Sequence, residues 1–310
     1  MEIIRGNEMP VDCVLTIGKF ESIHLGHQAL IKEVIFHAGQ NELVSAVMFF
    51  DPHPYVVLGD SEYKPLLTEI ERSYLLENLG LDYLLVRPFD RDFAALSPET
   101  FCDEIFCDYK ARVVIVGEGY RFGYQREGTV SLLQERAKVF GAVVKIVPSV
   151  DRWEKGKVST SHIRNLLTAN ELSEVQQLLG FPFFVMGVTQ RGRQLGRELG
   201  FPTLNIYPNG KFLPEDGVYV TLTDIDGIPY PGVTNIGLRP TVSPHSKTRS
   251  VETHLLDFPE KVASQEFYGQ HIKTEFLHFI RPERKFASLE DLKTQLIIDV
   301  KTANCISTET

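Results

Sequence analysis

Residues 187–205 read GVTQRGRQLGRELGFPTLN, a stretch with four closely spaced glycines followed by a Pro-Thr-Leu-Asn end. Because glycine has no Cβ, the backbone amides around Gly192 and Gly196 can approach an anion closely. The proline fixes the chain direction, so the Thr203 hydroxyl and the Asn205 carboxamide leave a rigid segment. Neutral oxygen ligands beside such a loop suit Mg²⁺ that carries nucleotide phosphates. The stretch therefore predicts a magnesium–nucleotide site, although glycine spacing alone would also fit a bulged strand with tight turns.

The sequence around this stretch predicts a small antiparallel β-barrel, with a sandwich as the alternative. Short β-rich runs are separated by turn residues at 183–188, 217–223, 230–237, 251–256 and 272–280. Ser288 and Asp291 have the spacing of a helix start, so a terminal helix is expected from there to about Val300. The polar tail from Cys305 onward is expected to fray.

The first half of the chain alternates strand and helix signals. Strands are expected at 11–17, 43–50, 82–89, 112–117 and 142–147, and helices at 24–37, 69–79, 98–109 and 132–140. This alternation predicts an α/β domain with a doubly wound parallel sheet. A helix at 171–179, stopped by Gly180, marks the boundary between domains 1–180 and 181–310.

Composition and charge exclude several classes of protein. A formal net charge of −9 argues against a nucleic-acid partner. No run is long enough to span a membrane and the first residues lack a signal-peptide pattern, so no membrane partner is expected. The four cysteines form no CxxC pair, which indicates reduced, buried thiols in a cytoplasmic protein.

A second candidate site follows the first expected strand, in TIGKFESIHLGHQAL (16–30). His24 and His27 lie three residues apart at a helix start, so both imidazoles project from one face. Gly26 leaves room for a nucleotide, and the helix N-terminus favours phosphate. At a strand-to-helix switch of a parallel sheet, the two histidines could stabilise charge that develops during attack on an α-phosphate. A structural histidine pair is the alternative, and zinc is disfavoured because no third ligand is evident.

Two further segments of the first half bear on phosphate binding. Ser159, Thr160 and Arg164 in VSTSHIR place hydroxyls at a helix start and a guanidinium one turn on, as a phosphate clamp would. An ordinary N-cap by one hydroxyl is the alternative. The segment GEGYRFG (117–123) has the wrong spacing for a dinucleotide fingerprint, so NAD binding is not expected.

Glu252 and Arg281 are the candidate polar residues of the barrel half. A carboxylate at Glu252 could accept a proton from a hydroxyl that attacks a γ-phosphate, although an isolated strand glutamate more often faces solvent. Arg281 could orient a substrate or phosphate, or form a surface ion pair. The chain lacks a GxxxxGK[ST] loop and is therefore not a P-loop kinase.

Taken together, these motifs resemble those of the prokaryotic bifunctional riboflavin kinase/FAD synthetase family over nearly the whole chain. The segments that carry the resemblance are GKFESIHLGH (18–27), FDPHP (50–54), VGEGYRFGYQREG (116–128), STSHIR (159–164), GRELGFPTLN (196–205), GVYV (217–220), NIGLRPT (235–241), VETHLLDF (251–258) and IRPERKF (280–286). Few families combine an HxGH nucleotidyltransferase domain with a GFPTxN barrel, which makes the resemblance specific.

The resemblance implies two activities that share ATP. The barrel would phosphorylate riboflavin to FMN with Mg²⁺, and the α/β domain would transfer AMP from ATP to FMN, giving FAD and pyrophosphate. Implied catalytic residues are Glu252 as kinase base, with His24 and His27 for adenylyl transfer. Implied nucleotide-binding residues are Gly18, Phe20, Gly26, Ser159, Thr160, Arg164, Gly192, Gly196, Thr203 and Asn205, with the last two as Mg²⁺ ligands. Implied flavin-binding residues are Pro52, Pro54, Gly119 and Arg281. We expect a monomer or weak homo-oligomer.

The first half departs from the family pattern at two places. The family usually reads G-x-F-D-G before the first histidine, whereas this chain has Glu21 and Ser22. Ser22 puts a side chain where the family's glycine would allow either a close backbone approach or an unusual φ. The family's VGxDF or VGxNF segment becomes VGEGY, so Gly119 replaces a polar flavin contact at a cost of about 1–3 kcal/mol. These departures suggest a riboflavin kinase with a weak or inactive adenylyltransferase domain as an alternative. A flavin-responsive regulatory protein is a third hypothesis, disfavoured by the intact Thr203, Asn205 and Glu252.

Overall fold

The computed structural model describes residues 1–60, 62–148, 158–192, 195–208, 210–239, 248–256 and 267–307. The chain forms two compact units, Met1–Ser159 and Thr160–Thr310. Helices α7 (Thr160–Thr168) and α8 (Leu172–Leu179), which precede the boundary predicted at residue 180, group with the second unit. Compactness does not test where the functional domains divide, so the boundary at 180 stays a prediction.

The first unit is built on a six-stranded sheet in which every neighbouring pair is parallel. The strands are β1 (Glu2–Arg5), β2 (Cys13–Ile17), β3 (Val44–Asp51), β4 (Tyr83–Pro88), β5 (Ala111–Gly117) and β6 (Val143–Val147). Their order is β1-β4-β3-β2-β5-β6, so the chain runs outward in one direction from β2 and in the other from β5. This order confirms the predicted doubly wound sheet.

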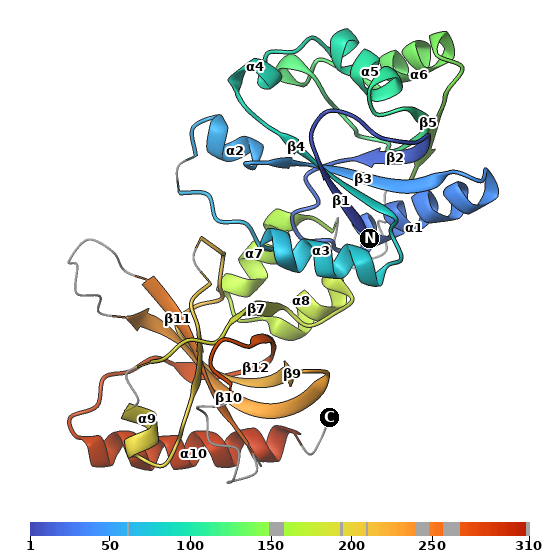
Figure 1. Cartoon of the computed structure of the whole chain (residues 1–310). Helices are drawn as coiled ribbons and strands as arrows, with labels where there is room; N and C mark the ends of the chain where they lie inside the picture. Colours follow the sequence, from blue (N-terminus) through green and yellow to red (C-terminus); the bar gives the residue numbers. More distant parts are fainter. Residues whose placement is uncertain are drawn as a thin grey trace. The chain divides into compact units, whose positions relative to one another are not determined.

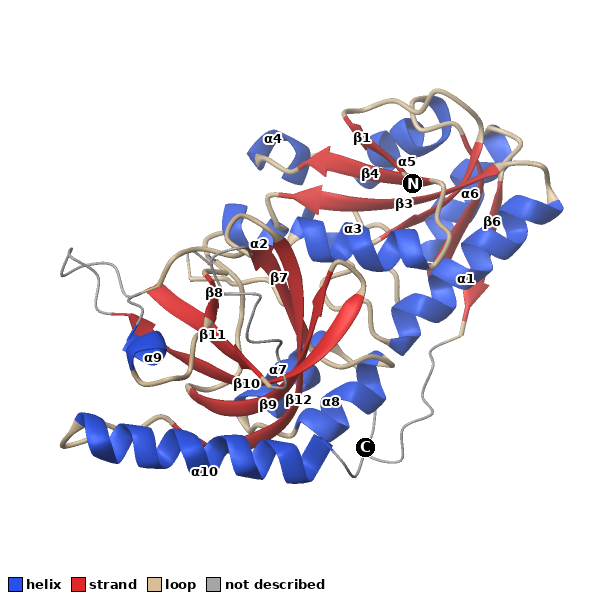
Figure 2. Cartoon of the chain, turned by 60° about the horizontal axis from the view of Figure 1, so that its bottom comes forward, coloured by secondary structure: helices blue, strands red, loops and turns tan. Residues whose placement is uncertain are grey.

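Helices cover both faces of this sheet (Figure 1). They are α1 (Leu25–Gln40), α2 (Pro54–Val57), α3 (Glu69–Asn78), α4 (Arg91–Ala94), α5 (Pro98–Cys107) and α6 (Val130–Val139), with a 3₁₀ turn at Tyr124–Arg126. Leu15 and Met48 pack with Phe101 of α5 and Leu133 of α6 on one face. On the other face Val14 packs under α1, and Figure 2 shows α3 on that same side. Side-chain alternation along the strands therefore builds two separate apolar layers.

Sequence analysis missed the edge strand β1 of this unit. The segment Glu2–Arg5 is short and mostly exposed, and it pairs only with β4, from Glu2 opposite Tyr83 to Arg5 opposite Val86. A four-residue strand with charged ends gives almost no apolar signal, because an edge strand needs little burial.

The second unit contains a six-stranded antiparallel sheet in the order β7-β12-β9-β10-β11-β8. Its elements after α8 are β7 (Phe184–Val188), α9 (Leu195–Glu198), β8 (Leu204–Ile206), β9 (Gly217–Ile225), β10 (Ile228–Arg239), β11 (Thr248–Leu255), β12 (His271–Pro282) and α10 (Leu289–Ser307). A bridge between Gln190 and Asn205 joins the two edges of the sheet. The predicted small barrel is confirmed, and the alternative of a sandwich is not.

Closure of the barrel depends on a close approach between β7 and β8. A Cβ added at Gly187 would lie 2.4 Å from Cγ2 of Ile206, so no larger residue fits without a shift. The buried barrel wall also contains threonines whose hydroxyls bond one another. Thr234 Oγ1 lies 2.7 Å from Thr221 Oγ1 and 2.8 Å from Thr253 Oγ1. The hydroxyls of these three buried threonines thus all have partners, as buried polar groups require.

The terminal helix α10 begins as predicted, because the backbone N–H of Asp291 donates to Ser288 Oγ at 3.1 Å. It continues to Ser307 and packs Ala303 against Val218 and Val220 of β9. The expected fraying from Cys305 was therefore wrong for Cys305–Ser307, since packing on the barrel extends the helix.

We expect Gly187→Ala to destabilise the second unit by about 1–3 kcal/mol, since the added methyl overpacks the β7–β8 contact. Calorimetric unfolding of the full chain measures this change. The matched control is Gly39→Ala on α1, where an added Cβ meets nothing within 4 Å. That control should stabilise the first unit by about 0.4–1 kcal/mol. Equal effects of the two substitutions would contradict the closure argument.

Candidate active sites

The first candidate site lies at the switch point of the parallel sheet. Strands β2 and β5 are neighbours, and helices leave them toward opposite sides. The loop 18–24 follows β2 at its carboxyl end, and Gly119 follows β5 at the same edge. Open α/β sheets bind ligands in the crevice at such a position. The topology therefore brings together two predicted segments that lie far apart in the sequence.

The loop between β2 and α1 holds two residues in strained backbone conformations. Phe20 has φ 42° and Ile23 has φ 45°, and both side chains are buried. Strain of this kind is kept where the surrounding structure fixes a functional loop. Ser22 has no positive φ, so the replacement of the family's glycine does not strain this position. The Phe20 ring also packs against Gly18, where a Cβ would lie 3.0 Å from the ring.

His24 and His27 form a stacked pair at the start of α1. Their ring centroids are 3.8 Å apart with an interplanar angle of 10°. His24 is the N-cap residue, and its Nδ1 accepts a hydrogen bond from the backbone N–H of His27 at 3.2 Å. Gly26 permits this geometry, because a Cβ there would lie 3.1 Å from the His24 ring. The glycine predicted to make room for a nucleotide thus makes room for the first histidine.

Both histidines are neutral near pH 7. Burial lowers the pKa of His24 to about 4. Burial, and then the nearby His24 and Arg72, hold the pKa of His27 well below its usual value. Because the Nδ1 of His24 accepts a hydrogen bond, its proton resides on Nε2, which can donate to a ligand. The pair therefore offers N–H donors and not full positive charges.

The proline turn after β3 lies beside this loop. Pro54 begins α2, and the Nδ1 of His53 accepts from the backbone N–H of Tyr55 at 3.2 Å. Lys19 Nζ lies 3.7 Å from the Tyr55 ring centroid, which links the loop 18–24 to the turn containing Pro52. The structure thus brings two predicted flavin-binding residues next to the histidine loop.

Gly119 lies in an open turn after β5. A Cβ added there would meet nothing within 4 Å, and its φ is not positive. The backbone would therefore accept the polar residue that the family pattern has at this position.

The other residues predicted to bind phosphate, Ser159, Thr160 and Arg164, lie where the first compact unit ends and the second begins in the sequence. Ser159 ends the first unit, and Thr160 begins α7 in the second. Within the second unit the Arg164 guanidinium lies 4.8 Å from the Phe212 ring centroid. A part played by these residues beside the histidines stays a prediction.

The second candidate site is a cavity of about 370 Å³ within the barrel unit. That volume lies in the usual range for a small-molecule pocket. Gly196, Thr203, Glu252 and Arg281 all line it. Residues from three predicted segments thus meet in one place, which sequence periodicity could not show.

Asn205 lies on β8 directly opposite Glu252 on β11. Its side chain is 2% exposed, and Nδ2 donates to the carbonyl oxygen of Thr203 at 3.2 Å. Its Oδ1 is buried and has no hydrogen-bond partner among the described residues. A buried amide oxygen without a donor needs a ligand, and a divalent cation would satisfy it. The donor set therefore fits the predicted Mg²⁺.

The glycines of the 187–205 stretch serve close packing around Asn205. A Cβ at Gly192 would lie 2.7 Å from Asn205 Nδ2, and one at Gly196 would lie 2.4 Å from the carbonyl oxygen of Phe201. Both glycines thus hold the Thr203–Asn205 segment in place. Contact with an anion remains a prediction for each.

Glu252 is half-buried and lines the cavity. Ser250 Oγ donates to its Oε1 at 3.0 Å, which orients the carboxylate. A second carboxylate, Glu283, lines the same cavity and was missed by sequence analysis. Burial, and then the charge of Asp216, raise the pKa of Glu283. In the sequence, only the place of Glu283 within the IRPERKF segment (280–286) could have indicated that it belongs to the site.

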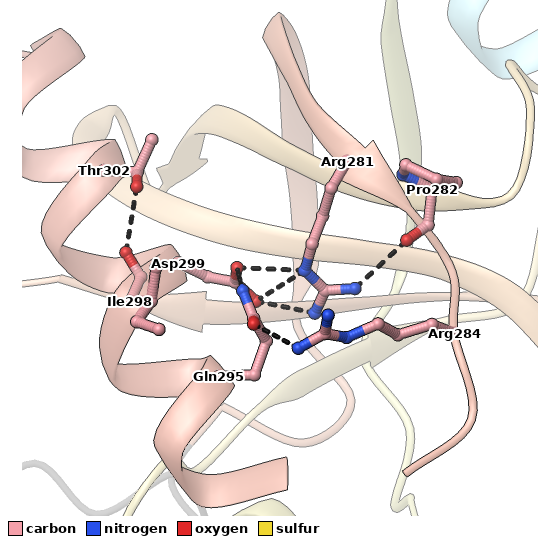
Figure 3. A network of polar contacts seen from close by, with 7 residues as sticks. All are labelled: Arg281, Pro282, Arg284, Gln295, Ile298, Asp299 and Thr302. Atoms are coloured by element: carbon pink, nitrogen blue, oxygen red, sulfur yellow. Dashed lines mark hydrogen bonds and ion pairs between the residues drawn. The ribbon is translucent and has the colours of Figure 1, made fainter. Parts of the chain in front are cut away.

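Arg281 is held by a buried ion pair (Figure 3). Its Nε lies 3.0 Å from Oδ1 of Asp299 and its Nη2 lies 2.7 Å from Oδ2, while Asp299 is 1% exposed. Gln295 Nε2 donates to the same carboxylate at 2.7 Å. The alternative of a surface ion pair was therefore wrong, because this pair joins β12 to α10 inside the cavity wall. Flavin binding by Arg281 stays a prediction.

Comparison with known proteins matches each half of the chain to its own family. The FAD synthetase family matches residues 7–162 and the riboflavin kinase family matches residues 179–307. The Escherichia coli K12 protein named bifunctional riboflavin kinase/FMN adenylyltransferase is 36% identical over 312 residues, covering 98% of this chain and 97% of that protein. The Bacillus subtilis protein of the same name is 35% identical over 296 residues, covering 94% and 91%. The chain belongs to the bifunctional riboflavin kinase/FMN adenylyltransferase family.

A solved structure shares the fold over nearly the full chain. The crystal structure of a Streptococcus pneumoniae protein described as a macrolide-efflux protein has a TM-score of 0.81 and 28% sequence identity, covering 97% of this chain and 98% of that one. No helix among the described residues of the present chain has the length and apolar character to cross a membrane. The likeness of fold covers nearly the whole chain, while the family membership rests on the sequence matches.

The low pKa of His24 should make the stability of this family member fall as the pH drops from 7 to 5. The unfolded histidine binds a proton below its ordinary pKa of 6.5, while the folded one does so only near 4. Unfolding is therefore favoured progressively within that window, by on the order of 2 kcal/mol between pH 7 and pH 5.

Calorimetry at the two pH values tests this expectation. His24→Asn keeps an N-cap acceptor and removes the titrating ring, so its loss of stability should be smaller than that of the wild type. His271→Asn, which replaces an exposed histidine, is the control and should behave like the wild type. A wild-type slope in His24→Asn would contradict the assignment.

Proposed function

We propose that the chain makes FMN from riboflavin in its barrel domain and FAD from FMN in its α/β domain, using ATP for both reactions. Family membership, with separate matches to each half, supports both activities and the domain limits 1–180 and 181–310. The single observation that carries the kinase proposal is the pairing of Glu252 with Asn205, whose buried Oδ1 lacks a partner among the described residues.

In the kinase reaction Glu252 accepts the proton of the terminal hydroxyl of riboflavin. That oxygen attacks the γ-phosphorus of ATP, the bond to the β-phosphate oxygen breaks, and ADP leaves. Thr203 and Asn205 would hold Mg²⁺, which neutralises phosphate charge when it is bound. Gly192 and Gly196 keep these two residues in position beside the nucleotide, and Arg281 lines the flavin end of the cavity.

In the adenylyl transfer a phosphate oxygen of FMN attacks the α-phosphorus of ATP, and pyrophosphate leaves. Neutral His24 and His27 donate N–H groups to the oxygens that gain charge, beside the N-terminus of α1. The residues Gly18, Phe20 and Gly26 shape the nucleotide loop. Ser159, Thr160 and Arg164 would supply the second phosphate-binding segment, and Pro52, Pro54 and Gly119 would border the flavin.

We also propose that the enzyme acts in the cytoplasm as a monomer or weak homo-oligomer. Its four cysteines are all free, which suits a reducing compartment. Its expected partners are riboflavin, FMN and ATP.

Incubation of the purified protein with ATP and Mg²⁺, first with riboflavin and then with FMN, tests the proposal when the flavins are resolved by chromatography. We expect FMN in the first reaction and FAD in the second. FMN without FAD would leave a kinase with an inactive first domain. No flavin product in either reaction would favour a flavin-responsive regulatory protein.

Glu252→Gln should lower the riboflavin kinase kcat by at least about 100-fold, because the amide cannot accept the hydroxyl proton. FAD formation from FMN should be unchanged, since it belongs to the other domain. The matched control is Glu275→Gln on β12, whose carboxylate pairs with Lys273 outside the cavity. A Glu252→Gln enzyme with the wild-type kcat would show that another group is the base.

Gly119→Asn should lower the KM for FMN in the adenylyl transfer by about tenfold to 100-fold, because it restores a polar contact in an open turn. The control is Gly141→Asn, which lies before β6 at the opposite edge of the sheet, at a φ of 67° that asparagine tolerates. Steady-state kinetics with varied FMN measure both. An unchanged KM in Gly119→Asn would mean that this turn does not contact the flavin.

A further inference from the structure

Arg72 on α3 is a buried cation. Its side chain is 5% exposed, and its guanidinium carbon lies 4.1 Å from the ring centroid of Phe49 on β3. Its Nε is buried and has no hydrogen-bond partner among the described residues. Arginine is almost never this buried unless it is paired, so its position requires an explanation.

The neighbouring carboxylates do not supply that partner. Glu21, Asp51 and Glu69 affect the pKa of Arg72 through longer-range charge, but burial dominates and lowers it. Glu69 is ion-paired with Arg5 instead. A buried charge left uncompensated costs stability, and an anion that binds there would recover part of that cost.

Arg72 lies on the same side of the sheet as the histidine site. Thr16 pairs in register with Val47, and alternation along β3 places Phe49 on the face of Val47, under α1 and α3. The charge of Arg72 also acts on His27. Thr16 Oγ1 and His27 Nδ1 are, like Arg72 Nε, buried and unpartnered among the described residues. Three unsatisfied polar groups therefore belong to one face beside the carboxyl end of β2.

We propose that Arg72 binds a phosphate group of a substrate in the first domain, an inference that rests on the proposed adenylyl transfer. The stacked histidines are neutral and the helix terminus supplies only a partial charge. ATP and FMN are both strongly anionic, so their binding requires full positive charge near the reacting phosphates. Arg72 supplies that charge in a water-poor setting, where a charge-assisted hydrogen bond is strongest.

Arg72→Met tests this role, because methionine keeps an apolar chain on Phe49 and removes the charge. Pyrophosphate is a suitable ligand, since it is a product of adenylyl transfer and not of the kinase reaction. In the wild type, pyrophosphate should raise the melting temperature of the first unit by mass action. In Arg72→Met the ligand-free melting temperature should be equal or higher, and the pyrophosphate shift should be lost if Arg72 binds the nucleotide phosphates.

Kinetics separate the two phosphate sources. If Arg72 binds the nucleotide, the variant should raise the KM for ATP, and for pyrophosphate in the reverse reaction from FAD, by about 10- to 100-fold. If it binds the flavin phosphate, the KM for FMN should rise by that factor and pyrophosphate should still stabilise the protein. Arg112→Met, which removes an exposed arginine paired with Asp12, is the matched control and should leave all values unchanged.

A cooperative melting transition of the first unit without ligand shows that the variant remains folded there, and unchanged riboflavin kinase activity shows that the second unit is unaffected. Unchanged KM values together with a retained pyrophosphate shift would overturn the inference. A large fall in the ligand-free melting temperature with a retained shift would make Arg72 structural, and Arg72→Lys then provides a folded variant for the same measurements. The wild type could form no FAD while pyrophosphate still raises its melting temperature and fails to raise that of Arg72→Met. This result would refute the adenylyl transfer but would support a phosphate site at Arg72.

Discussion

The kinase site depends on one short-range constraint, the packing of the three-residue strand β8 between β11 and the end of β7. Because β8 pairs with β11, Asn205 comes opposite Glu252, and because it also meets Gln190, the barrel closes. Larger side chains at Gly187 or Gly192 would force Ile206 or Asn205 to shift and so weaken these contacts. The same glycines that close the barrel thus bring Glu252, the proposed base, beside Asn205, the proposed metal ligand.

Each half of the chain buries a polar atom that lacks a hydrogen-bond partner among the described residues, at or near its candidate site. In the barrel wall the hydroxyls of Thr221, Thr234 and Thr253 satisfy one another. By contrast, Asn205 Oδ1 in one site and Arg72 Nε near the other are buried without a partner among the described residues. A buried polar atom without a partner lowers the stability of the ligand-free protein. A ligand that bonds to this atom finds it already fixed in place, so no further reorganisation is needed on binding.

Periodicity predicted the elements with strong apolar patterns, including β2 to β6 and the long strands of the barrel. It did not predict β1 or β8, since strands of four and three residues contain too few positions for a pattern. Among site residues, Glu252, Thr203 and Asn205 carried motif signals. Arg72 carried none, because an arginine within a helix normally lies on its exposed face.

The sequence by itself determined the two fold classes, the HxGH and GFPTxN motifs and the family, since each depends on local spacing and apolar periodicity. Tertiary structure alone decided that Gly26 accommodates His24, that Arg281 is neutralised by Asp299, and that Arg72 is buried on Phe49. These outcomes depend on contacts between residues distant in the chain or on rotamers fixed by packing. No local pattern encodes them, because burial and pairing are properties of the assembled fold.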